Sequence, residues 1–204
     1  MFSHKIHDCI WIDEAGRGAW AGPVVAGAAM FAGKQRRWEW RVFLSHMSDS
    51  KNMSEKKREY MYDRMHELVR ERYLYLGIGM MDNTVIDIVG IWDANRQAML
   101  EAIYTLGYQC PLWDKNIIID GRDNYVFPDI SNPVTYLVKG DTKVLQTMCA
   151  ALNAKVTRDR LMRWYDNQFS GYSFAQHKGY GTKKHQEALA CLGVCEIHRK
   201  SYQP

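Results

Sequence analysis

Strand-like runs come first in this sequence, and helical patterns are interleaved with further strand-like runs later. The branched or alternating apolar pattern of β-strands occurs at residues 7–13, 24–31, 73–80, 116–120 and 134–138. The apolar spacing of helices occurs at residues 54–71, 95–106, 139–164 and 182–192. This order predicts an α/β fold with a mixed β-sheet. Because no repeat or linker-like tract divides the chain, we expect a single domain over residues 1–204.

The charge and the cysteines exclude some classes of protein. Lys and Arg number 27 and Asp and Glu 23, and a net charge of +4 permits an anionic partner without requiring one. The five cysteines are odd in number and form no CxxC pair, so a disulfide scaffold or structural zinc site is not expected. Residues 1–12 lack the apolar core of a signal peptide, and residues 19–33 are too short to cross a bilayer. We therefore expect a cytoplasmic protein with no membrane contact.

Acidic residues stand at or just beyond the ends of three predicted strands: Asp13 with Glu14, then Asp120, then Asp141. Any one of them could be a turn former or a helix N-cap. Residues beyond the carboxyl ends of strands converge on one crevice in α/β sheets, and carboxylates brought together there need cations. Oxygen ligands of this kind suit Mg²⁺ or Mn²⁺, and two such ions catalyse phosphodiester hydrolysis.

Two loops could contact a nucleic acid. Residues 16–22 have the spacing GxGxxxG and precede a strand-like run, so a dinucleotide-binding turn is rejected in favour of close backbone approach to a sugar-phosphate chain, or a plain tight turn. Residues 177–185 form a basic loop around Tyr180, which could stack on a sugar or base or could simply pack. Lys51 is similarly ambiguous. His177, His185 and His198 lack a metal-ligand spacing, and we expect them at the surface or facing phosphates.

The motifs, taken together and in order, resemble those of the ribonuclease HII family, the type 2 ribonucleases H. The similarity covers nearly the whole chain and is carried by these segments: Asp13-Glu14-Ala15-Gly16-Arg17-Gly18, Ala21-Gly22-Pro23-Val24-Val25-Ala26, Asp49-Ser50-Lys51, Asp120-Gly121, Lys139-Gly140-Asp141, residues 154–160, residues 177–182, and His198-Arg199-Lys200-Ser201.

The resemblance implies a ribonuclease H-like mixed β-sheet flanked by helices, with a helical C-terminal part. It also implies a metal-dependent endonuclease that cleaves the RNA strand of RNA/DNA hybrids. Such an enzyme also cuts on the 5′ side of single ribonucleotides in duplex DNA, leaving 3′-hydroxyl and 5′-phosphate ends.

The family's functional residues map onto this chain as follows. The carboxylates that bind two Mg²⁺ or Mn²⁺ ions correspond to Asp13, Glu14, Asp120 and Asp141. The backbone of Gly16, Arg17 and Gly18 would contact the ribose 2′-hydroxyl, Tyr180 would stack on the neighbouring deoxyribose, and Lys51 and Lys178 would hold phosphates. Two residues depart from the family pattern: Ala19 replaces a proline and Ala151 replaces a serine, and we expect weakened activity at most.

Asp159 is a rival for the fourth metal ligand. It follows Asp141 by 18 residues, which in one helix corresponds to roughly 27 Å. No pair of metal ions bridges that distance, so we expect Asp159 to pair with an arginine instead.

Two alternative functions stay open at this stage. A ribonuclease HIII-like enzyme would need an additional N-terminal domain, for which the residues before Asp13 leave no room. A hybrid-binding protein that no longer cleaves is disfavoured because all four carboxylates are present. We expect a monomer, and residues after His198 show no tail for docking a sliding clamp.

Overall fold

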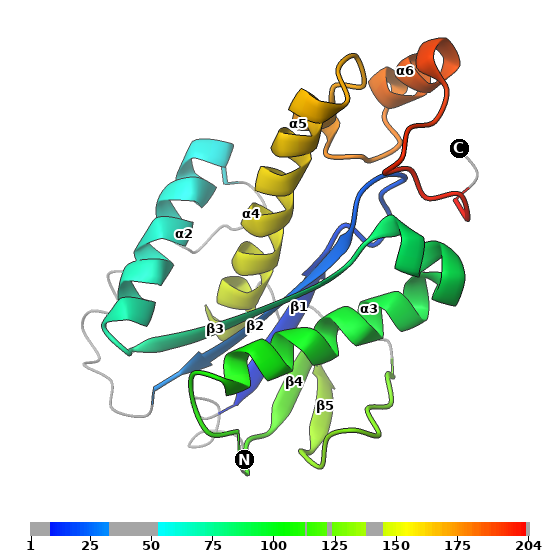
Figure 1. The fold of residues 1–204 in the computed structure, drawn as a ribbon. Coiled ribbons are helices and arrows are strands. Elements are labelled where there is room, and N and C mark those ends of the chain that lie inside the picture. Colours follow the sequence, from blue (N-terminus) through cyan, green and yellow to red (C-terminus); the bar gives the residue numbers. More distant parts are fainter. Residues whose placement is uncertain (1–8, 33–52, 113, 122–123, 138–144, 203–204) are drawn as a thin grey trace.

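The computed structural model describes residues 9–32, 53–112, 114–121, 124–137 and 145–202. Within these residues one sheet has the strand order β3-β2-β1-β4-β5 (Figure 1). The strands are β1 (Ile10–Ala15), β2 (Val24–Phe31), β3 (Leu74–Met81), β4 (Ile117–Asp120) and β5 (Val134–Leu137). The β1–β2 and β2–β3 pairs are antiparallel, and the β1–β4 and β4–β5 pairs are parallel. The predicted mixed sheet is confirmed.

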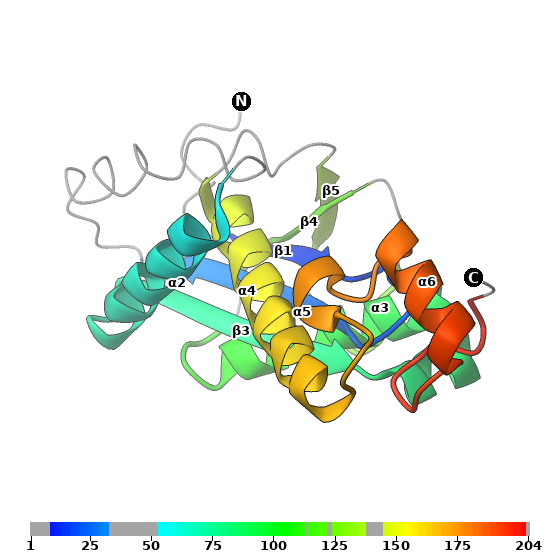
Figure 2. The same cartoon turned by 90° about the horizontal axis from the view of Figure 1, so that it is seen from above.

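Helices cover both faces of this sheet. Helix α3 (Asn83–Gly107) packs on one face, and α4 (Leu145–Gln168) packs on the other with α2 (Glu55–Arg70) beside it (Figures 1 and 2). All eight residues of β2 are buried, because alternate side chains face α3 and α4. A Cβ atom on Gly27 would lie 2.2 Å from the carbonyl oxygen of Ala150, so the glycine lets α4 approach the sheet closely.

Two boundaries differ from those predicted. Strand β1 continues past Asp13 through Ala15, so Asp13 lies within the end of the strand. Helix α3 begins twelve residues before the predicted 95 because the Asp82 side chain accepts a hydrogen bond from the Val85 N–H (2.8 Å) and caps the helix. The helix bends at Gly90, whose φ is 79°, which explains why its first turns do not continue the apolar period of the rest.

The C-terminal part contains α5 (Phe174–His177) and α6 (Lys183–Leu192), as expected. The chain after α6 returns to the segment between β1 and β2, where Ala21 forms an isolated antiparallel bridge with His198. The Arg199 N–H also donates to the carbonyl oxygen of Trp20 (2.8 Å). Among the described residues, no helix is both long and apolar enough to cross a bilayer.

Candidate active site

Two of the predicted carboxylates lie at the carboxyl ends of neighbouring parallel strands. β1 and β4 pair in a register that ends with Ile12 opposite Ile119, so Asp13 and Asp120 are the next residues on the two strands. Both side chains are partly exposed. On the other side, Asp120 pairs with Leu137 at the end of β5. The sheet therefore brings Asp13 and Asp120 to one edge, as parallel strands require.

The other two carboxylates are placed differently. Glu14 follows Asp13 on β1; its N–H donates to Asp13 Oδ1 (2.8 Å), and its carboxylate lies 4.0 Å from the Arg17 guanidinium. Asp141 lies outside the described residues. Within the part of the chain that the structure describes, no group of three or more His, Cys, Asp or Glu side chains could hold a metal ion. The quartet of metal ligands therefore stays a prediction.

The glycine-rich loop after β1 is held from behind by the buried Arg199. Its Nε donates to the carbonyl oxygen of Gly22 (2.9 Å). Its terminal nitrogens donate to the carbonyl oxygens of Arg17 (2.9 Å) and Gly16 (2.7 Å). The Tyr202 hydroxyl donates to the Arg17 carbonyl as well (2.6 Å). One C-terminal guanidinium therefore fixes the course of the whole loop.

A second buried arginine, Arg158 on α4, holds the same loop from the other side. Its Nε donates to the carbonyl oxygen of Pro23 (2.8 Å). Its terminal nitrogens donate to the carbonyl oxygens of Lys178 (2.8 Å) and Ala21 (3.0 Å). Burial lowers the pKa of Arg158 to about 10, so the group is still charged at neutral pH. Gly16 has a φ of +89°, and a Cβ there would lie 1.9 Å from the Arg158 Nε, so no other residue fits.

Ala19 gives a physical reason for one departure from the family pattern. Its N–H donates to the carbonyl oxygen of Gly16 (3.3 Å) and closes the turn. A proline at this position has no N–H and could not form this bond. The loop thus replaces the stiffness of a proline with a hydrogen bond.

The loop that carries Tyr180 is attached to the glycine-rich loop. The Trp20 N–H donates to the carbonyl oxygen of Gly179 (2.8 Å), and the Tyr180 N–H donates to the carbonyl oxygen of His177 (2.9 Å). The half-buried Tyr180 ring lies 5.4 Å from the guanidinium carbon of Arg158. The two loops expected to contact substrate are therefore joined into one unit.

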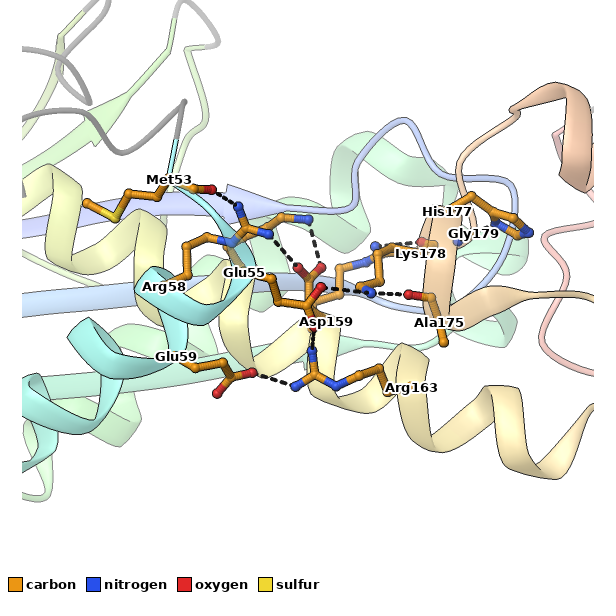
Figure 3. Close-up of polar contacts among 12 residues, drawn as sticks. Met53, Glu55, Arg58, Glu59, Asp159, Arg163, Ala175, His177, Lys178 and Gly179 are labelled. Atoms are coloured by element: carbon orange, nitrogen blue, oxygen red, sulfur yellow. Dashed lines mark hydrogen bonds and ion pairs between the residues drawn. The ribbon is translucent and has the colours of Figure 1, made fainter.

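The structure describes one of the two lysines that were predicted to hold phosphates, and that lysine is buried. Lys178 is only 6% exposed, its ammonium group donates to the carbonyl oxygen of Ala175, and it lies 3.8 Å from the Glu55 carboxylate (Figure 3). Burial lowers the pKa of Lys178. Lys178 has a φ of 53° and its side chain is buried, and its role as a phosphate ligand stays a prediction. Lys51 lies outside the described residues.

Asp159 has the arginine partner that the sequence predicted. Its carboxylate lies 3.8 Å from the Arg58 guanidinium (Figure 3). It also lies 2.7 Å from the Lys155 ammonium. The carboxylate is 3% exposed, and both cations come from helices rather than from the sheet edge. Asp159 therefore stabilises the contact between α2 and α4.

The expectation for the histidines was wrong. His177, His185 and His198 are 8%, 0% and 5% exposed and contact one another beneath the Tyr180 loop. Burial lowers the pKa of all three, and that of His185 falls from 6.5 to about 4. Sequence spacing gave no sign of this cluster, because its members come from three separate segments.

We expect Arg199→Lys to destabilise the protein by roughly 2–4 kcal/mol, because an ammonium group cannot replace a planar guanidinium that donates to three buried carbonyls. Denaturant unfolding measures this change. The control is Arg70→Lys, at an exposed position in the last turn of α2, which should change stability by less than about 0.5 kcal/mol. Equal stabilities for the two variants would show that the hydrogen bonds of Arg199 do not stabilise the loop.

We also expect the free energy of unfolding to decrease as the pH falls from 6.5 towards 4. Over this interval the unfolded chain binds a proton at residue 185 that the folded protein does not bind. Denaturant unfolding at several pH values measures the slope, and His185→Phe should flatten it. Equal slopes in the wild type and the variant would show that His185 is not held neutral.

The chain was compared with known proteins. Residues 10–204 match the family model for Ribonuclease HII. The ribonuclease HII of Bacillus cytotoxicus (strain DSM 22905 / CIP 110041 / 391-98 / NVH 391-98) is 39% identical over 193 residues, which cover 95% of this chain and 67% of that protein.

Solved structures share the fold at lower identity. A chain in the PCNA:RNase HII complex from Archaeoglobus fulgidus has a TM-score of 0.72 at 20% identity, with 96% of this chain and 95% of that chain covered. The ribonuclease H2 from Pyrococcus horikoshii OT3 has a TM-score of 0.69 at 21% identity, with 96% and 93% covered. Bst-RNase HIII in complex with Mn²⁺ has a TM-score of 0.60 at 15% identity, with 98% and 73% covered.

These matches confirm the resemblance that the motifs indicated. The family model spans residues 10–204, and the Bacillus protein matches over nearly the whole chain. The chain therefore belongs to the ribonuclease HII family, endonucleases that hydrolyse the RNA strand of RNA/DNA hybrids.

Proposed function

We propose that this protein uses divalent metal ions to cleave RNA/DNA hybrids, and that it also cuts on the 5′ side of single ribonucleotides embedded in duplex DNA. The products would carry 3′-hydroxyl and 5′-phosphate ends. One observation carries the proposal: Asp13 and Asp120 directly follow the last paired residues of the parallel strands β1 and β4, and the loop bound by Arg199 follows β1. The predicted cytoplasmic location and monomeric state remain part of this proposal.

The carboxylates fit a pair of divalent cations. Asp13 and Asp120 offer hard oxygen ligands at one edge of the sheet, and both are partly exposed. Together with Glu14 and Asp141 they would hold Mg²⁺ or Mn²⁺. Bound ions of this kind supply an activated water and stabilise the leaving 3′-oxygen of the phosphodiester. The contribution of the chain is to place these acids beside the loop that would receive the ribonucleotide.

The glycine-rich loop would recognise the ribose. No described peptide bond is cis, and in a trans peptide the N–H points opposite to the carbonyl. Because Arg199 binds the carbonyls of Gly16 and Arg17, the N–H groups of Arg17 and Gly18 point away from the clamp. Gly18 is exposed, and a Cβ there would meet no atom within 4 Å. This open backbone surface suits a 2′-hydroxyl, the group that distinguishes RNA from DNA.

Two side chains flank that surface. Tyr180 would stack on the deoxyribose next to the ribonucleotide. Its loop is joined to the glycine-rich loop by the hydrogen bond from the Trp20 N–H to the carbonyl oxygen of Gly179. The partly exposed Arg17 lies 5.8 Å from the Trp92 ring and would reach a phosphate or sugar. Lys178 is left out of this proposal because it is buried.

A hybrid-binding protein that does not cleave is the second candidate. The family membership, and the place of Asp13 and Asp120 directly after the paired residues of β1 and β4, favour the nuclease. Binding of the hybrid with no strand cleavage in the presence of Mg²⁺ or Mn²⁺ would favour the second candidate.

We expect Asp13→Asn and Asp120→Asn each to lower the cleavage rate on the order of a hundredfold or more, because each removes a charged oxygen ligand from the sheet edge. Cleavage of a hybrid with a labelled RNA strand, in Mg²⁺ and separately in Mn²⁺, measures the rate. Asp93→Asn, on α3, is the matched control and should keep the wild-type rate. A full rate in either active-site variant would refute its role.

We expect Gly18→Ala to lower cleavage about tenfold while the unfolding temperature stays unchanged, because the added methyl group meets no protein atom but stands where the ribose would lie. Gly16→Ala is the contrasting variant and should destabilise the fold, since its Cβ would overlap the Arg158 side chain. Steady-state cleavage and thermal unfolding of both variants test this. Wild-type cleavage by Gly18→Ala would show that the ribose lies elsewhere.

A further inference from the structure

Three buried imidazoles lie beneath the Tyr180 loop and form a network: one hydrogen bond joins His185 to His198, and the other bonds go to main-chain groups. Its members lie on separate segments: His177 ends α5, His185 lies on α6, and His198 follows α6. The His177 and His185 rings stack with centroids 4.4 Å apart, and the His185 and His198 centroids are 5.2 Å apart. Phe174 packs edge-on against His177 and His185, and Trp20 lies 5.7 Å from His185.

Hydrogen bonds to main-chain groups determine which ring nitrogen of His198 and of His185 carries the proton. His198 Nδ1 accepts the Cys195 N–H (2.8 Å) and also lies 3.3 Å from the Cys195 carbonyl oxygen. Because that carbonyl already accepts the His198 N–H (3.0 Å), the shorter contact favours the tautomer with the proton on Nε2. That Nε2 lies 3.0 Å from His185 Nε2, which must therefore accept. The proton of His185 is then on Nδ1, 3.1 Å from the carbonyl oxygen of Tyr180, and it donates there.

His177 is fixed in the same way. Its Nδ1 accepts the Gly179 N–H (3.2 Å), so its Nε2 carries the proton and donates to the carbonyl oxygen of Tyr172 (2.7 Å). The segment on both sides of Tyr180 is thus bound to two imidazoles, each in one tautomer.

The network works only while the rings are neutral. A proton on His185 Nε2 would point at the N–H of His198, and two donors cannot form a hydrogen bond. Among the described residues, Asp166 and the lysines 178 and 184 lie near His177, and Cys195 and Tyr172 lie near His198. The Cys195 sulfur is 3.1 Å from His198 Nδ1, and the Tyr172 ring centroid is 5.3 Å from that of His198. Burial lowers the pKa of each imidazole, which keeps the rings uncharged near neutral pH.

We infer that His185 and His198 are positioning residues: their directed hydrogen-bond chain sets the backbone of Tyr180, and through it the place of the tyrosine ring at the substrate. This inference rests on the proposed function, because only a substrate-contacting Tyr180 makes the positioning matter. Among the described residues, the hydrogen bonds of the two imidazoles go to Tyr180, to Cys195 and to each other, so the two histidines act through Tyr180 and not as acid or base.

Nuclear magnetic resonance of the full chain, ¹⁵N-labelled at histidine, tests the geometry without substrate. We expect the Nδ1–H tautomer at His185 and the Nε2–H tautomer at His177 and His198. We also expect a scalar coupling across the hydrogen bond between His198 Nε2 and His185 Nε2, and no change from pH 7.5 to pH 6. A cationic ring or the opposite tautomer at His185 or His198 would overturn the inference.

Matched variants test the consequence for cleavage. Asparagine at position 185 keeps a donor near the place of Nδ1, whereas phenylalanine keeps the ring without a donor. On a duplex with one embedded ribonucleotide, we expect His185→Phe to raise KM about fivefold, the effect of one lost neutral hydrogen bond, with kcat little changed. His185→Asn should recover most of this loss. His66→Phe, on α2, is the control for removing an imidazole.

The outcomes separate the two claims. Equal KM values for His185→Phe, His185→Asn and wild type, or an equal loss in both variants, would overturn the positioning role. If the wild-type protein does not cut this duplex, the proposed function fails instead. The tautomers then still decide whether the hydrogen bonds of His185 and His198 form as described. If His185→Phe does not fold, the tautomers together with the KM of His185→Asn decide the inference.

Discussion

Two buried guanidinium groups are the constraint on which the candidate site depends. Arg158 and Arg199 are 0% and 2% exposed, and each donates three hydrogen bonds to main-chain carbonyls. A buried charge without such partners would cost several kcal/mol, so the carbonyls and the arginines determine each other's positions. The glycine-rich loop therefore has little freedom once α4 and the C-terminal segment are in place.

In this arrangement the sheet positions the carboxylates, and the loops carry the other residues proposed to contact the substrate. The parallel β1–β4 pair sets Asp13 beside Asp120 through backbone register alone. The loop that follows turns its carbonyls inward to the arginines and its exposed Gly18 outward. The histidines beneath Tyr180 complete the unit with hydrogen bonds that carry no charge. A site of this kind is preorganised, since the protein has already bound the polar groups that would otherwise compete for substrate.

The sequence predicted the parts of this site that follow from local patterns. Alternating apolar residues that end in an acid predicted Asp13 and Asp120 at strand ends. The helical pattern predicted over residues 54–71 matches α2, which Ser54 caps by accepting from the Lys57 N–H (3.3 Å). Arg158 and Arg199 could not be found in this way, because their partners are carbonyls up to 183 residues away. Lys178 and His185 looked like members of a solvated basic loop. Their burial depends on the backbone turn at Lys178 and on the packing of α6, which residue spacing does not encode.

We propose that the acids at the sheet edge and the glycine-rich loop act together on a ribonucleotide. Mapping the cut site on a DNA duplex that contains one ribonucleotide tests it most directly, with Mg²⁺ or Mn²⁺ added and with the ions removed by a chelator. We expect a single cut on the 5′ side of the ribonucleotide, with 3′-hydroxyl and 5′-phosphate ends, and no cut in the chelator. Cleavage at another position, or equal cleavage without divalent ions, would contradict it.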